Sequence, residues 1–139
     1  MSWTKFFLRI LTPVVAILFF ASVAEAKMQI YEGIGIFTIT AGETQNFAKK
    51  QAKLYAERDA LEQIYLFVKS QSSEKNFDLT KDEIITVAAG RMNVLKTKFF
   101  TAKDDENRFV ITATVIAEID ADEIPEAVER ERQKRLQDS

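Results

Sequence analysis

Apolar side chains occupy every odd position from Phe109 to Ile119, and this strict alternation constrains the fold more than any other feature. A period of two residues places these side chains on one face of a β-strand, so that face must pack against a core. The even positions carry threonines and Glu118, together with Val110 and Ile116. The segment therefore predicts a strand in a sheet of which at least one face is covered.

A polar turn at residues 104–107 precedes this strand and predicts a β-hairpin. The two strands of the hairpin are expected over residues 91–102 and 108–119. The alternation is less regular in the first of them. Its adjacent Phe99 and Phe100 predict either a bulge or an environment with apolar contacts on both faces.

The segment 28–40 is rich in Ile, Phe, Tyr and Thr, which is a strand composition. Its apolar residues fall on both faces, so we expect other elements to cover both sides of this strand. Gly33 and Gly35 share a face, where they would let a helix approach closely. They do not form a dinucleotide-binding fingerprint, because that motif needs a third glycine where Thr38 stands.

A long helix is expected over residues 43–72, which contain no Gly or Pro. Thr40 and Glu43 have the spacing of a capping box at its start. Small residues recur every four positions along one face, namely Ala48, Ala52, Ala56 and Ala60. The stripe continues with bulkier residues, namely Tyr55, Ile64 and Phe67. The small end suits a close contact with the two strand glycines.

A polar loop at residues 70–76 separates this helix from a shorter one. Thr80 and Glu83 repeat the capping-box spacing and predict a helix that continues to about Ala89. Gly90 is expected to end it in the left-handed conformation that glycine favours.

Asp120 and Asp122 offer N-caps for a terminal helix, and Pro125 is compatible with its first turn. Residues 126–138 are almost all charged or polar. We expect them to form a marginal, solvent-exposed helix that frays.

These elements predict a small α+β domain with a long helix packed on a mainly antiparallel sheet. Their order is strand, helix, short helix, strand, strand, helix. The expected divisions are a signal peptide at residues 1–26, an α/β envelope domain at 27–122 and a charged helical tail at 123–139.

The first residues have the layout of a secretory signal peptide. Lys5 and Arg9 are basic, residues 10–20 are uncharged, and Ala24 and Ala26 give the small-x-small pattern before cleavage. The uncharged stretch is shorter than the roughly 20 apolar residues that cross a bilayer. Cleavage after Ala26 and a periplasmic or secreted location are therefore expected. The alternative is an uncleaved segment that anchors the chain in the membrane.

The composition excludes several kinds of chemistry. The chain has no His and no Cys, so it lacks the usual general base, thiol nucleophiles, cysteine-held metals and a cysteine-linked lipid anchor. Its net charge of −2 disfavours nucleic-acid binding. The acidic residues in 104–106 and 120–123 suit a solvated turn and a helix cap better than a cation site. We expect no catalytic residues, no cofactor and no metal.

Three functional hypotheses follow. The leading one is an exported, non-enzymatic module that contacts an envelope protein or a second copy of itself, with the sheet edges as a route. The alternative is a periplasmic protein that binds a small ligand or a peptidoglycan fragment, with Tyr31, Arg58 and Asp59 as candidate pocket residues. The third, a hydrolase that uses carboxylates alone, lacks a visible partner for Asp59. An internal polar contact from Asp59 to a strand or a neighbouring subunit is the simpler interpretation.

Residues 29–122 resemble the Lpp20-like and flagellar-assembly-protein-T N-terminal-like family of bacterial envelope domains. The resemblance is carried by Tyr31-Glu32-Gly33-Ile34-Gly35, Ala48, Ala52, Ala56-Glu57-Arg58-Asp59-Ala60, Gly90 and Val110-Ile111-Thr112-Ala113-Thr114-Val115. It implies an exported α/β domain that serves as a non-enzymatic envelope or flagellar accessory module. Many relatives have a lipoprotein cysteine after the signal, which this chain lacks, and the family supplies no set of functional residues.

Overall fold

The computed structural model describes residues 27–74 and 78–139, and it confirms the small α+β fold. Its elements are β1 (Gln29–Thr38), α2 (Gln45–Glu74), α3 (Lys81–Arg91), β2 (Asn93–Lys103), β3 (Phe109–Ile119), a 3-10 turn (Ala121–Glu123) and α4 (Ile124–Asp138). The expected signal peptide at residues 1–26 lies outside the described residues and stays a prediction.

The three strands form one antiparallel sheet in the order β1-β3-β2, with the alternating strand β3 at its centre. The register of β2 shifts between Val94 and Lys96. Of the two alternatives for Phe99 and Phe100, the bulge is therefore not the one that occurs. These two residues pair regularly with β3 and point to opposite faces, which is the two-sided arrangement that the sequence left open.

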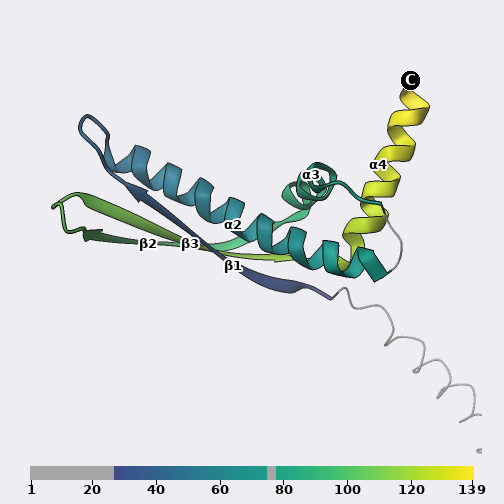
Figure 1. Cartoon of the computed structure of the whole chain (residues 1–139), viewed down its shortest axis with the longest axis horizontal. Coiled ribbons are helices and arrows are strands. Elements are labelled where there is room, and N and C mark those ends of the chain that lie inside the picture. Colours follow the sequence, from purple (N-terminus) through teal and green to yellow (C-terminus); the bar gives the residue numbers. More distant parts are fainter. Residues whose placement is uncertain (1–26, 75–77) are drawn as a thin grey trace, which may run out of the picture.

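The long helix α2 lies along one face of the sheet (Figure 1). Its alanines are fully buried, and the first three of them pack against buried odd residues of β3, namely Ile111, Ala113, Val115 and Ala117. A Cβ atom added to Gly33 would lie 2.0 Å from the carbonyl oxygen of Ala56. One added to Gly35 would lie 2.1 Å from the carbonyl oxygen of Ala52. The predicted close contact between the two glycines and the alanine stripe is confirmed.

A second core with larger side chains lies where α2, α3 and α4 meet the end of β3. Its buried members are Ile64, Val68, Ile84, Ala88, Ile119, Ala121, Ile124 and Val128. Shape explains the division: alanines let the first half of α2 approach the sheet, whereas the isoleucines and valines fill the wider space where three helices diverge.

Two helix ends differ from the expectation. The first turn of α2 is capped by Thr44, whose side-chain oxygen accepts from the Phe47 amide at 3.1 Å. Thr40 instead starts a turn in which Gly42 has a φ of 85°, so the capping-box spacing there was misleading.

The capping box at Thr80 and Glu83, at the start of α3, is confirmed. Gly90 lies within α3 without a left-handed backbone, because the helix continues to Arg91.

The terminal helix α4 is not exposed throughout, contrary to expectation. Ile124, Pro125, Ala127 and Val128 are buried, so the first turns of α4 belong to the second core. Neither Asp120 nor Asp122 caps a helix through its side chain: the cap position of α4 is Glu123. The few apolar residues at the start of the tail fall on one face, and that face is sufficient for docking.

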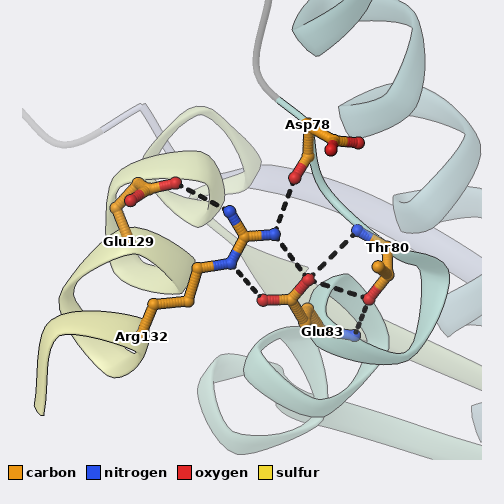
Figure 2. Close-up of polar contacts among 5 residues, drawn as sticks. All are labelled: Asp78, Thr80, Glu83, Glu129 and Arg132. Carbon is orange, nitrogen blue, oxygen red and sulfur yellow. Dashed lines mark hydrogen bonds and ion pairs between the residues drawn. The ribbon is translucent and has the colours of Figure 1, made fainter. Parts of the chain in front are cut away.

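An ion-pair cluster fastens α4 to the start of α3 (Figure 2). The Arg132 guanidinium binds both carboxylate oxygens of Glu83, at 2.5 and 2.6 Å, and donates to the Asp78 carbonyl at 2.6 Å. Glu129 accepts a further bond from Arg132 at 3.0 Å. Glu83 also closes the capping box with Thr80. One carboxylate therefore serves both the helix cap and the contact between helices.

The cluster predicts an acid-sensitive step in stability. The pKa of Glu83 is lowered from 4.5 to about 2, chiefly by the hydrogen bond from Arg132 and also by those from Thr80. A lowered folded-state pKa means that this contribution is complete above pH 4.5 and is lost as the pH falls towards 2. The urea midpoint should fall more steeply from pH 4.5 to 2 in the native chain than in Glu83→Gln. Parallel curves for the two proteins would contradict the role given to this carboxylate.

Candidate interaction surface

No described helix lies on the face of the twisted sheet opposite α2, and we name this face the open face (Figure 1). Strand period and register place on it Ile30, Glu32, Ile34, Ile36 and Thr38 of β1, Val110, Thr112, Thr114, Ile116 and Glu118 of β3, and Asn93, Lys96, Lys98, Phe100 and Ala102 of β2. The expectation that β1 is covered on both sides was therefore wrong for the described part of the chain.

Large apolar side chains on the open face are strongly exposed. Ile30 is 60% exposed, Ile34 51%, Ile36 59% and Phe100 68%. The half-buried Ile116 lies on the central strand between them. Single exposed apolar residues are ordinary, but a row of isoleucines on one strand with a phenylalanine two strands away forms a patch. Such patches are typical of surfaces that bind another protein.

The open face has charged residues in only part of its area. Glu32 on β1 and Lys96 on β2 both pair with Ile116 of β3, so they share one row across the sheet. Lys98 lies in the next row, opposite Thr114. The rows beyond that contain only apolar residues and threonine. The surface is therefore apolar at one end and carries opposite charges on its two edge strands at the other.

The outer edge of β1 is occupied by side chains of α2. Asp59 Oδ2 accepts from the Ile34 amide at 2.8 Å, and Gln63 Nε2 donates to the Glu32 carbonyl at 2.7 Å. These are two of the edge groups that would pair with an added strand. The predicted contact from Asp59 to a strand is confirmed. Because this edge is partly satisfied, the open face is a better docking surface than the edge of β1.

The candidate pocket residues do not come together around a cavity. The Tyr31 hydroxyl donates to Gln29 Oε1 at 2.8 Å, its ring packs on the second core, and burial raises its pKa. Arg58 is exposed on α2, and Asp59 binds the edge of β1. The geometry therefore gives no support to a ligand site at Tyr31, Arg58 and Asp59.

Elsewhere in the described structure, residues of α4 line two hollows. The larger, of about 470 Å³, lies between α3 and α4 and is lined by Thr86, Val87, Gly90, Arg91, Ala127, Arg130, Glu131 and Arg135. Arg91 is paired with Glu123 at 3.3 Å. The smaller, of about 230 Å³, is lined by residues of α2 and α4 and of the turn between β3 and α4. Sequence reasoning missed the arginine-lined hollow, because it treated the tail as separate from α3.

The acidic turn at residues 104–107 is stabilised internally. Asp104 accepts from the backbone amides of Arg108 and Glu106 at 2.9 and 3.0 Å and from the Arg108 side chain at 2.9 Å. The Arg108 amide above all keeps the pKa of Asp104 below its ordinary value. Within residues 27–74 and 78–139, no three acidic side chains converge closely enough to hold a metal ion.

The chain matches no family model, no curated protein and no solved structure. In the part of the chain that the structure describes, no helix combines the length and the apolar character needed to cross a bilayer.

Proposed function

We propose that this protein is an exported, non-enzymatic module of the bacterial cell envelope that acts through protein–protein contact at the open face. The observation that supports this most directly is the exposure of Ile34, Ile36 and Phe100 on a regular sheet surface. Burying these side chains against a partner would remove apolar surface from water and so lower the free energy of the system. The resemblance to flagellar and envelope accessory domains agrees with an assembly role.

The composition favours a binding role over catalysis. Without histidine and cysteine, proton transfer and nucleophilic attack near neutral pH would depend on carboxylates, lysines, hydroxyls or a bound cofactor. Asp59, the carboxylate considered for this purpose, is engaged by the Ile34 amide. This carboxylate thus holds the edge of β1 against α2.

Site-specific cross-linking in the native envelope tests the role of the open face. A photo-activatable residue in place of Ile36 should give discrete adducts with protein, and Phe100→Lys on the same face should abolish them. The matched control is the same probe in place of Leu66, which is 62% exposed on α2. Equal labelling from both positions, or none from Ile36, would contradict the proposal.

Export predicts a defined mature terminus. If the signal is removed after Ala26, protein purified from cells that express the full chain begins at Lys27. Intact mass and N-terminal sequencing measure this directly, and Ala26→Asp should block cleavage because the enzyme site needs a small residue there. Recovery of the native chain from the cytosol with residue Met1 or its successor at the N-terminus would contradict export.

A second candidate function is the binding of an anionic small molecule, such as a peptidoglycan fragment with its stem carboxylates, between α3 and α4. The hollow there has the size of a small-molecule site, and three arginines line it. Calorimetric titration with a soluble muropeptide tests it. We expect a Kd below about 1 mM for the native chain and about tenfold weaker binding in the double variant Arg130→Gln, Arg135→Gln. The absence of heat at millimolar ligand would exclude this second function.

A further inference from the structure

The two edge strands of the open face carry complementary groups in the same rows. Ile36 of β1 and Phe100 of β2 both pair with Thr112, and Glu32 and Lys96 both pair with Ile116. Within one chain β3 separates them by about 10 Å, since neighbouring strands lie about 4.8 Å apart. Among the described residues Glu32 and Lys96 form no ion pair. Both side chains are exposed, so each is free to pair with an opposite charge on a partner that lies above the sheet.

We infer that the partner of the open face is the open face of a second copy, related by a two-fold axis that runs nearly parallel to β3. This inference rests on the proposed function, because it names the occupant of the same surface. The rotation places β1 of one copy over β2 of the other in the same row. Ile36 then packs on Phe100 of the second copy and Glu32 meets Lys96 of the second copy, and each contact occurs twice.

The charges distinguish this arrangement from the other simple two-fold pairing of the faces. An axis across the strands would place β2 over β2, so Lys96 and Lys98 would face the same strand of the other copy. Like charges at that distance are unfavourable, and Glu32 would lie over β1 with no cation opposite. Of the two axes, the one along β3 satisfies both the Glu32–Lys96 row and the Ile36–Phe100 row, and it places Lys98 over Ile34 of the other copy in the row between them.

The dimensions of the face suit an aligned sandwich. Stacked sheets lie about 10 Å apart and cross at about 30°. At this separation the threonines of β3 in the two copies can meet across the axis. The two Glu118 carboxylates at the end of β3 lie near each other across this axis, and their repulsion weakens the association. Strands of up to 11 residues, at about 3.3 Å per residue and 4.8 Å between strands, give a face of roughly 500 Å² in projection.

Two such faces bury roughly 1,000 Å², which is at the lower limit of specific interfaces. The expected state is therefore a reversible dimer whose population depends on concentration. Its formation needs no change in the fold, since the facing side chains are already exposed.

Exchange of the charged row gives a test with a matched control. Glu32→Lys places two lysines in the row, and Lys96→Glu places two acids there, so each variant alone should dimerise at least tenfold more weakly than the native chain at low salt. An equimolar mixture of the two variants restores both pairs and should form a heterodimer of native strength.

Lys50→Glu on the exposed side of α2 is the charge control and should leave the equilibrium unchanged. Sedimentation equilibrium measures these four samples and the native chain. A mixture that associates no better than its components overturns this geometry.

A second measurement does not depend on charge. The chain contains no cysteine, so Thr112→Cys introduces a single thiol on the central strand of the open face, where the axis along β3 brings the residue close to its own copy. A bis-maleimide that spans about 10 Å, the separation of stacked sheets, should link two chains through this thiol. Leu66→Cys on α2 is the matched control and should not give the covalent dimer.

The outcomes separate this inference from the proposed function. A native chain that remains monomeric at about 1 mM overturns pairing with a second copy. If the probe at Ile36 still gives adducts with a different protein in the envelope, the open face remains a binding surface with another occupant. If that probe gives no adduct of either kind, both proposals are overturned.

Discussion

Gly35→Ala should lower the free energy of unfolding by about 3 kcal/mol or more, which is a large fraction of the stability of a domain this small. The new Cβ would lie 2.1 Å from the Ala52 carbonyl oxygen and 2.3 Å from the Ala56 amide nitrogen. Both atoms belong to the backbone of α2, so no side chain can rotate away, and the helix must lift from the sheet. Urea denaturation followed by circular dichroism measures the loss.

Gly90→Ala is the matched control and should change stability in the opposite direction. Gly90 lies within α3, and a Cβ there meets no atom within 4 Å. Alanine is favoured over glycine in a helix by up to about 1 kcal/mol. If the two alanine variants had the same stability, the close contact between β1 and α2 would not be what requires Gly35.

Ile64→Ala should cost about 2–5 kcal/mol, whereas Ile36→Ala should cost about 1 kcal/mol or less. The same chemical change is made in both variants, but Ile64 is fully buried in the second core and Ile36 is 59% exposed on the open face. Removing Ile64 leaves a cavity among three helices, while removing Ile36 exposes little that was covered.

The comparison must be made with dilute protein, because association would add to the apparent stability of the native chain and not to that of Ile36→Ala. Denaturation at a concentration at which sedimentation shows only monomer meets this condition. A loss in Ile36→Ala as large as that in Ile64→Ala would mean that the open face is part of the folding core and not a free surface.

Local patterns were sufficient to predict the framework of the fold. The odd positions of β3 and the four-residue spacing of the alanines each have one physical solution, a covered strand face and a small helix stripe. Gly33 and Gly35 then fix where the stripe lies, because only glycine leaves room for a helix backbone at that distance. Capping was less predictable: Thr40 has the correct spacing, but Thr44 is the residue that caps α2.

The open face could not be predicted because alternation does not show what lies above a strand. Apolar residues at both odd and even positions of β1 fit a strand between two layers or a strand with one layer and a partner. The structure distinguishes these, since no described helix lies on this face of β1 (Figure 1) and both Ile34 and Ile36 are exposed. The docking of α4 was missed for a related reason, because Ile124 and Val128 are too few to form a visible stripe among many charges.

Isoleucine methyl spectra test most directly whether the open face is the binding surface. The δ1 methyls of Ile30, Ile34, Ile36 and Ile116 report on that face, and those of Ile64, Ile84, Ile119 and Ile124 report on the second core. Spectra are recorded as the native chain is concentrated from about 20 µM to 1 mM, and again with envelope extract at low concentration. We expect the first group to shift or broaden in at least one of these series while the second stays unchanged. Two results would contradict the claim that the open face is the binding surface. One is a change confined to Ile84 and Ile124 on α3 and α4, and the other is no change in either series.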